Sequence, residues 1–525
     1  MAEHVALGVG PVTFADVVAV ARHDATVTLT DEALAAIDAA REVVERLAAS
    51  PTPTYGVSTG FGALATRHIP TGMRAQLQRS LVRSHAAGSG PEVEREVVRA
   101  LMLLRLSTLA TGHTGVRRET AELLAALLTH GITPVVHEYG SLGCSGDLAP
   151  LAHCALALMG EGPVRTRDGE LTDAASALAA AALAPVQLQE KEGLALINGT
   201  DGMLGMLVLA IDDLTDLLKV ADIAAAMSVE GQLGTDRVFA AELQAIRPHP
   251  GQAASAANLT ALLRDSGVVA SHRGPDCNRV QDAYSLRCSP QVHGGVRDTV
   301  AHAASVASRE LASAVDNPVV LVSTDLTSGR VESNGNFHGA PVAYVLDFLA
   351  IVTADLASIS ERRTDRFLDT ARNHGLPPFL ADDPGVDSGL MIAQYTQAAI
   401  VSELKRLANP ASVDSIPSSA MQEDHVSMGW SAARKLRRAV DGLTRVLAVE
   451  LLTAARALDL RVSTGSTTGT TTSPATAAVV ALLRGAGVGG PGTDRFLAPE
   501  IQTAYQLVAA RAVTAAVAPV IGELQ

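Results

Sequence analysis

The stretch from Gly140 to His153 contains three residues that can convert their own backbone into an electrophile. If the nitrogen of Gly146 attacks the carbonyl carbon of Cys144 and two waters leave, residues 144–146 close into a five-membered imidazolone. Ser145 supplies the lost hydroxyl and becomes a methylidene, while Gly146 has no side chain to obstruct the sharp backbone approach. Such a ring provides an electron-poor carbon that ordinary side chains lack.

A short Ser-Gly-Asp sequence also has a simpler interpretation, which is a turn that caps a helix beginning near Asp147. Gly140 and Gly143 would let the flanking chain bend tightly in either case. Asp147 could hold a proton or a backbone amide during dehydration.

The whole run, Gly-Ser-Leu-Gly-Cys-Ser-Gly-Asp-Leu-Ala-Pro-Leu-Ala-His, is more specific. It resembles the aromatic amino acid ammonia-lyases and aminomutases, which share Gly-Ser-hydrophobic-Gly-Ala-Ser-Gly-Asp-Leu-Ala-Pro-Leu. The resemblance implies that Cys144, Ser145 and Gly146 form 4-methylideneimidazole-5-one autocatalytically, with no external cofactor. Cys144 departs from the usual alanine. Because position 144 contributes only its carbonyl and alpha carbon to the ring, we still expect the ring to form.

Two further segments match the family pattern and imply catalytic groups. Tyr55, in the glycine-dense segment 55–62, corresponds to the tyrosine implicated in removing the β proton of the substrate. That role requires the tyrosine pKa to fall below its usual value of about 10. Asn198 would hydrogen-bond the imidazolone oxygen. Without the resemblance, Tyr55 would be a turn residue and Asn198 the N-cap of the following helix.

A third matching segment implies a group that binds a carboxylate. The guanidinium of Arg287 can hold a substrate carboxylate through two parallel hydrogen bonds, although a lone arginine more often forms a surface ion pair. The family match places Gln281 and the catalytic residue Tyr284 in the same pocket. It adds Asn317, otherwise a turn residue, and Phe337, otherwise a core residue, which would keep water from the ring.

Two positions distinguish substrates within the family. Ser84 and His85 replace the Phe-Leu of phenylalanine lyases and the His-Leu of tyrosine lyases, and this pair resembles the enzymes that act on histidine. Glu423 stands where phenylalanine enzymes usually carry glutamine. A carboxylate suits an imidazole, which donates N–H, and would be left without a partner against phenyl. The alternatives are a core histidine at His85 and a helix-start residue at Glu423.

The resemblance, which spans about residues 55–428, therefore implies elimination of ammonia from L-histidine to give trans-urocanate, the first step of histidine degradation. An electrophilic ring would assist by capturing the amine or by attacking the imidazole, and the sequence leaves both routes open. The alternatives are a tyrosine or phenylalanine lyase or an aminomutase of the same family. A non-catalytic helical scaffold is the alternative from another class, and it predicts an unmodified mass for residues 144–146.

Two other enzyme classes fit the sequence less well. The fumarase and argininosuccinate lyases carry Gly-Ser-Ser-x-Met-Pro, whereas residues 418–422 read Ser-Ser-Ala-Met-Gln. Pyridoxal phosphate enzymes need a lysine for a Schiff base. The four lysines of this chain, none in a recognisable cofactor motif, are Lys191, Lys219, Lys405 and Lys435.

Composition limits the partners and the location. The chain has 525 residues and a formal net charge of −14, with no block of basic residues, so a nucleic-acid partner is not expected. The start Met-Ala-Glu-His lacks a signal peptide, and no uncharged apolar run reaches the roughly 18 residues of a membrane span, so we expect a cytoplasmic protein without membrane contact. The histidines show no metal-ligand spacing. The cysteines, which form no Cys-x-x-Cys pair, are Cys144, Cys154, Cys277 and Cys288.

Hydrophobic periodicity predicts a mainly α fold, because apolar residues recur at three- and four-residue spacing over long segments. We expect a loop-rich N-terminal domain at 1–199, which carries the ring-forming residues, and an elongated α-helical bundle at 200–525. The resemblance implies a fumarase/aspartase-like fold and a homotetramer with active sites built from several subunits. Residues 463–473 are of low complexity and predict a flexible surface loop, and 174–184 a peripheral helix. The other helices are predicted at 92–109, 118–130, 201–230, 341–363, 388–408 and 430–461.

Overall fold

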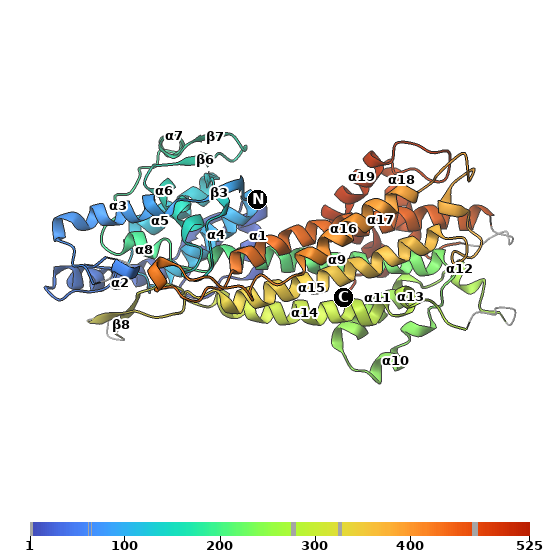
Figure 1. Cartoon of the computed structure of the whole chain (residues 1–525), viewed down its shortest axis with the longest axis horizontal. Coiled ribbons are helices and arrows are strands. Elements are labelled where there is room, and N and C mark those ends of the chain that lie inside the picture. The colour runs from blue at the N-terminus through green and yellow to red at the C-terminus, as the bar shows by residue number, and fades with distance from the viewer. Residues whose placement is uncertain (1–3, 61, 65, 275–279, 324–327, 465–470) are drawn as a thin grey trace. The chain divides into compact units, whose positions relative to one another are not determined.

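The computed structural model describes residues 4–60, 62–64, 66–274, 280–323, 328–464 and 471–525. Cys277 and positions 465–470 of the predicted surface loop lie outside these ranges. Within the described residues the chain forms twenty α-helices and nine short strands (Figure 1). The prediction of a mainly α fold is therefore confirmed.

The chain divides into two compact units, each assembled from three segments. Unit 1 comprises residues 1–212, 303–347 and 410–434, and unit 2 comprises residues 213–302, 348–409 and 435–525. Each unit contains three separate segments because the boundaries between the units fall inside long helices. The division predicted at 199/200 stays a prediction. The helices that belong to both units are α9 (Asp201–Gly231), α14 (Ser289–Leu311), α15 (Ala340–Leu368) and α17 (Gly429–Thr464).

Unit 1 combines shorter helices with all nine strands, which form small sheets (Figure 1). Its helices are α1 (Phe14–Arg22), α2 (Asp31–Ala49), α3 (Arg74–His85), α4 (Arg95–Ala110), α5 (Arg118–His130), α6 (Leu148–Leu158), α7 (Ala174–Ala180) and α8 (Glu192–Ala195). One pair is parallel, β1 (His4–Leu7) with β2 (Thr26–Leu29). The antiparallel pairs are β3 (Ser89–Glu92) with β5 (His137–Tyr139), β4 (Thr133–Pro134) with β6 (Pro163–Arg165), β6 with β7 (Leu171–Asp173), and β8 (Val319–Val322) with β9 (Gly329–Glu332).

The named secondary-structure elements of unit 2 are all helices within its described residues, and loops connect them. Besides its parts of the four long helices it contains α10 (Ala241–Ala245), α11 (Pro250–Leu262), α12 (Gly267–Ala270), α13 (Tyr284–Arg287), α16 (Met391–Leu407), α18 (Pro474–Gly485), α19 (Ala498–Ala509) and α20 (Ala512–Ile521).

The long predicted helices form close to their expected bounds, because apolar residues on several faces let them be buried along their length. In α9 the side chains from Met203 to Leu209 are buried, and so are those from Ile223 to Met227. The predicted helix at 118–130 coincides with α5, and the predicted peripheral helix is the short α7.

Helix α15 is long and apolar enough to cross a membrane when the described residues are judged by length and composition alone. Asp347 and Asp355 interrupt its apolar sequence, and 61% of its apolar window is buried inside the protein. Core helices pass the same test, so this property carries no further conclusion.

The expectation of a surface loop at 463–473 is wrong at its two ends. Ser463 belongs to the last turn of α17. Ser473 is fully buried and caps α18, since its hydroxyl accepts the N–H of Thr476 and donates to the carbonyl of Leu262 at 2.6 Å. The serine and threonine composition therefore supplies helix caps here as well as loop residues.

Apolar packing places the tyrosine-bearing segment in unit 1. Val57 is fully buried in a cluster with Val43 and Val44 of α2 and Val320 of β8. Because Val57 is anchored in this way, the neighbouring Tyr55 is carried on a packed segment.

Candidate active site

A cavity of about 600 Å³ in unit 1 brings together most of the side chains that the sequence predicted. It is lined by Tyr55, Ser84, His85, Ser145, Asn198, Asn317, Phe337 and Glu423. Other residues complete the wall and were not predicted, among them Leu77, Ser80, Leu81, Leu148, Leu194, Ser419 and the charged Arg67. These residue types occur throughout the chain and carried no distinguishing signal.

The ring-forming residues lie against Glu423. The hydroxyl of Ser145 donates to Glu423 Oε1 at 3.1 Å, and the thiol of Cys144 donates to Oε2 at 3.4 Å. The Ser418 hydroxyl donates to the same Oε2 at 3.0 Å. Burial, followed by the nearby Glu423 carboxylate, raises the pKa of the Cys144 thiol to about 11. Cys144 is therefore a neutral thiol at physiological pH.

Hydrogen bonds hold the segment after Glu423 on the segment that precedes Ser145. The hydroxyl of Ser427 donates to the carbonyl of Gly143 at 2.8 Å, and the N–H of Met428 donates to the carbonyl of Leu142 at 2.8 Å. The indole N–H of buried Trp430 donates to the carbonyl of Glu138 at 2.7 Å. Glu423 thereby faces residues far away in the sequence.

The backbone around Gly146 fits the proposed cyclisation. Gly146 has a φ of +73°, and a Cβ at this position would lie 2.1 Å from the carbonyl oxygen of Gly199. Such an approach excludes any side chain, so only glycine satisfies both the conformation and the space. The turn contains the two groups that the imidazolone requires, a serine hydroxyl and a glycine nitrogen in a tight bend.

Asp147 occupies the N-cap position of α6, so the helix begins where the simpler interpretation placed it, but the Asp147 side chain has other partners. It precedes α6 but makes no side-chain capping bond to that helix. Its Oδ2 instead accepts the N–H groups of Gly202 and Met203 at 2.9 Å each, and its Oδ1 accepts the Ser141 hydroxyl at 2.8 Å. Complete burial raises the pKa of Asp147 to about 7, against the opposing effect of these donors.

The pKa of Tyr55 differs from the expectation for a general base. Burial raises the pKa of its phenol, and the negative charges of Glu423 and Asp316 add to this effect. The N–H of Gly62 donates to the phenolic oxygen at 3.5 Å and opposes the rise. A cation near Tyr55 would favour the phenolate, and Arg67 lines the same cavity.

His85 is held in a defined orientation at the end of α3. Its Nδ1 lies 2.9 Å from the carbonyl of Leu81, which accepts only if Nδ1 carries the hydrogen. Burial lowers the pKa of His85, while Leu81 and Glu423 act in the opposite direction. The neutral tautomer with hydrogen on Nδ1 keeps Nε2 as an acceptor.

Asn198 and Asn317 are joined directly. The Nδ2 of Asn198 donates to the carbonyl of Asn317 at 2.9 Å, and the buried Oδ1 of Asn198 has no hydrogen-bond partner among the described residues. Because an amide nitrogen carries two hydrogens, Asn198 retains a second donor. The side chain of Asn317 accepts from Ser333 and from the N–H of Asn334.

Gln281, Tyr284 and Arg287 belong to unit 2 and are not among the residues that line the cavity of unit 1. They form a group of their own around α13. The guanidinium of Arg287 lies 4.7 Å from the centre of the Tyr284 ring, and its Nη2 donates to Gln281 Oε1 at 2.8 Å. Within the described residues, no group of three or more His, Cys, Asp or Glu side chains could hold a metal ion.

Comparison with known proteins shows the family of this chain. A family model described as aromatic amino acid lyase matches residues 12–485. Histidine ammonia-lyase of Streptomyces griseus is 67% identical over 520 residues, which cover 99% of each chain. Among solved structures, tyrosine aminomutase from Streptomyces globisporus is 39% identical with a TM-score of 0.91, over 99% of each chain. Histidine ammonia-lyase from Trypanosoma cruzi is 36% identical with a TM-score of 0.88, over 99% of this chain and 96% of that one. The chain belongs to the aromatic amino acid lyase family.

Proposed function

We propose that this protein is a histidine ammonia-lyase, which eliminates ammonia from L-histidine to give trans-urocanate. The observation that carries the proposal is the cavity of unit 1, where His85 and Glu423 lie beside Ser145. The full-length similarity to histidine ammonia-lyase supports the same substrate.

The two polar groups at the cavity wall suit an imidazole. Neutral His85 offers Nε2 as an acceptor, and the Glu423 carboxylate offers a second acceptor. An imidazolium has two N–H donors that could satisfy both groups, whereas a phenyl ring would leave both without partners. In this proposal His85 and Glu423 orient the substrate ring.

The prosthetic group would be 4-methylideneimidazole-5-one, formed by Cys144, Ser145 and Gly146, and it would supply an electrophilic carbon. Asn198 would hold its oxygen through the second amide hydrogen, and Phe337 would exclude water. Tyr55 would take the β proton of the substrate. Asp147, by binding the first N–H groups of α9, would keep the ring-forming turn in place.

The substrate carboxylate requires a cation, and Arg287 is the proposed one. We propose a cytoplasmic homotetramer in which Gln281, Tyr284 and Arg287 complete the site from a partner subunit.

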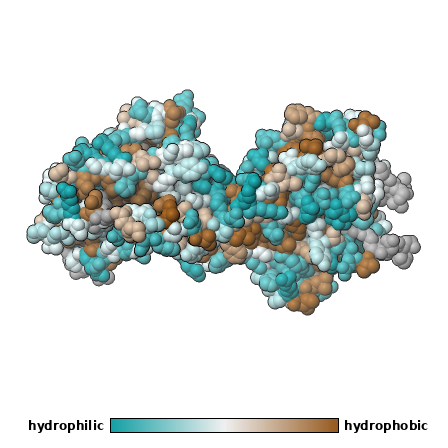
Figure 2. Space-filling model, in the orientation of Figure 1, coloured by the Kyte–Doolittle hydropathy of each residue, from teal (hydrophilic) through white to brown (hydrophobic). Residues whose placement is uncertain are grey.

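Exposed apolar side chains on one face of α15 support assembly, since Tyr344, Phe348 and Ile351 are 58%, 45% and 44% exposed in the single chain. Hydrophobic residues also lie among hydrophilic ones on the face drawn in Figure 2. Light scattering of the purified protein tests the proposed assembly.

The ultraviolet spectrum over time, together with an ammonia assay, tests the reaction with L-histidine, L-tyrosine and L-phenylalanine supplied separately. A conjugated acrylate and ammonia from histidine alone would support the proposal. Product from tyrosine or phenylalanine instead would refute the assigned substrate. If none of the three reacts and residues 144–146 keep their unmodified mass, the lyase assignment itself is wrong.

A further inference from the structure

Lys191 is a fully buried cation that the proposed chemistry has not used. Its Nζ lies 2.5 Å from Oδ2 of Asp316, and both side chains are completely shielded from solvent. A buried charge is tolerated only when it is paired, so each of these residues depends on the other. Desolvation lowers the pKa of Lys191, and Asp316 opposes that effect.

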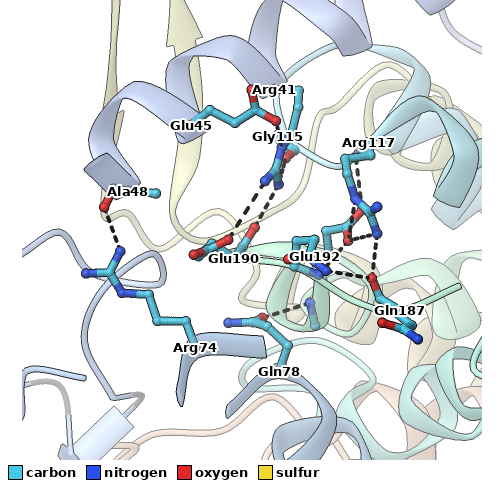
Figure 3. Close-up of polar contacts among 12 residues, drawn as sticks. Arg41, Glu45, Ala48, Arg74, Gln78, Gly115, Arg117, Gln187, Glu190 and Glu192 are labelled. Atoms are coloured by element: carbon cyan, nitrogen blue, oxygen red, sulfur yellow. Dashed lines mark hydrogen bonds and ion pairs between the residues drawn. The ribbon is translucent and has the colours of Figure 1, made fainter. Parts of the chain in front are cut away.

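The backbone of Lys191 is held in an unfavourable conformation. Its φ is +73°, in the left-handed region that residues with a side chain rarely adopt. The preceding peptide is fixed by Arg41 of α2, which donates to the carbonyl of Glu190 at 2.9 Å. The following helix α8 is fixed by Gln78 of α3, whose Oε1 accepts the N–H of Gly193 at 2.9 Å. Figure 3 shows these contacts side by side.

Arg117 adds a second clamp on the same segment. Its Nη2 donates to the carbonyl of Gln187 at 2.6 Å and to the Glu192 carboxylate at 2.8 Å (Figure 3). Glu192 is fully buried and also accepts the Thr120 hydroxyl at 2.6 Å. With contacts on both sides of Lys191, the surrounding structure determines where its amine can lie.

Hydrogen bonds connect Asp316 to two residues that line the cavity. Its Oδ1 accepts the N–H of Asn317 at 2.7 Å, and the carbonyl of Asn317 accepts the amide of Asn198 at 2.9 Å. Both asparagines line the cavity. Asp316 also acts electrostatically on Tyr55, where its negative charge disfavours the phenolate.

We propose that Lys191 is a positioning residue of the active site, which neutralises Asp316 beside Tyr55 and fixes Asn317 and Asn198 through the same carboxylate. This inference rests on the proposed function, because Tyr55 acts as a base only in that reaction. Lys191 does not touch the substrate; it acts through Asp316.

The other charges near Tyr55 stay in place when Lys191 is replaced, so they do not account for a difference between the variants. They include Arg67, an exposed cation that lines the same cavity as Tyr55. Glu423 faces Tyr55 with a negative charge, and His85, which lies near Glu423, is kept neutral by burial. Arg105, whose charge also acts on Lys191, is paired with Asp201 at 3.5 Å. The acids that flank Lys191 in sequence are paired with arginines, Glu192 with Arg117 and Glu190 with Arg41, and Glu310, which acts on Asp201, accepts the Thr200 hydroxyl.

Lys191→Gln removes the charge and retains a donor for Asp316. Loss of the cation leaves the negative charge of Asp316 near Tyr55 uncompensated and raises the pKa of Tyr55. The pH at which kcat reaches half of its maximum should therefore increase by about one unit. At neutral pH kcat should then fall by about tenfold. In Lys191→Gln/Asp316→Asn both charges are gone and Asn317 keeps its acceptor, so the profile should return to the wild-type position.

The experiment measures kcat and KM for L-histidine against pH, normalised to the fraction of protein whose 144–146 peptide has lost two waters. Arg99→Met is the matched control: Arg99 is fully buried in unit 1 and bonds the carbonyls of Val20 and Leu128 away from the cavity lining. It should lower Tm without moving the profile. For Asp316→Asn alone, the midpoint of the kcat profile should lie at the wild-type pH or below it.

An unchanged profile for Lys191→Gln, or an equal shift in the double variant, would overturn the inference. An upward shift for Asp316→Asn would also overturn it, and this isosteric variant decides the matter if Lys191→Gln does not fold. Absence of ammonia production by the wild-type protein would instead refute the proposed function, so the two failures are distinguishable.

Discussion

The hydroxyl of Ser145 donates to Glu423 at 3.1 Å across 278 positions of sequence. The carboxylate predicted to face the substrate ring therefore also contacts the hydroxyl that must leave during ring formation. Glu423 can therefore affect both ring formation and substrate binding. Its position depends on the hydrogen bonds of Ser427 and Met428, which hold its segment against residues 142–143. The effects of changing Glu423 on the two events can be separated.

Glu423→Gln should lower kcat/KM for L-histidine by about 10- to 100-fold, since a neutral amide is a weaker partner for imidazole N–H groups. Turnover of L-phenylalanine relative to L-histidine should rise. The amide oxygen can still accept the Ser145 hydroxyl, so the 144–146 peptide should lose two waters as in the wild type. Steady-state kinetics and peptide mass measure the two effects. Asp424→Asn, at an exposed neighbour, is the charge-matched control, and an equal loss there would contradict the role of Glu423.

Ser145→Ala should abolish nearly all activity, because the alanine has no hydroxyl to eliminate and no methylidene can form. The mass of the 144–146 peptide should equal that of the unmodified sequence. Circular dichroism and Tm should stay close to the wild-type values, since the variant loses little more than the hydrogen bond from the Ser145 hydroxyl to Glu423. Full turnover by this variant would refute the proposed prosthetic group.

The helices were predictable because burial along long segments repeats a period that the sequence displays. Residues 118–130 are one example, where the capping glycine at position 131 adopts a φ of +74° and ends the helix. The grouping of His85, Ser145 and Glu423 was predictable only through the family resemblance, since these residues come from separate segments. No local pattern predicts which distant loops a cavity will join.

Lys191 was beyond the sequence analysis for a physical reason. As one of four lysines it was considered only as a Schiff-base residue. Its burial depends on Asp316, 125 positions away, and on arginines from other helices. The pKa of Tyr55 was missed similarly, because its rise follows from burial and from distant carboxylates.

The pH dependence of stability should contain a contribution from Asp147. Burial raises its pKa from 3.8 to about 7, so the folded state binds this proton more tightly than the unfolded state. The resulting stabilisation is fully present below pH 3.8 and is lost as the pH rises through about 7. Asp147→Asn lacks this titration. The Tm of the wild type minus that of the variant should therefore fall between pH 4 and pH 8, as scanning calorimetry can measure. A difference independent of pH would contradict the assignment.

The buried pair of Arg363 and Glu450 in unit 2 should behave as a coupled unit. Both side chains are fully buried, with Nε to Oε1 at 2.5 Å and Nη2 to Oε2 at 2.9 Å. Arg363→Met or Glu450→Leu alone leaves one charge without its partner and should cost about 3–5 kcal/mol of unfolding free energy. The double variant replaces both charges by apolar groups, so its loss should be smaller than the sum of the two. Ser360→Ala, which removes one hydrogen bond to Glu450, is the control and should cost about 1 kcal/mol. Denaturant unfolding of all four variants measures the cycle, and additive losses would mean that the pair does not act as a unit.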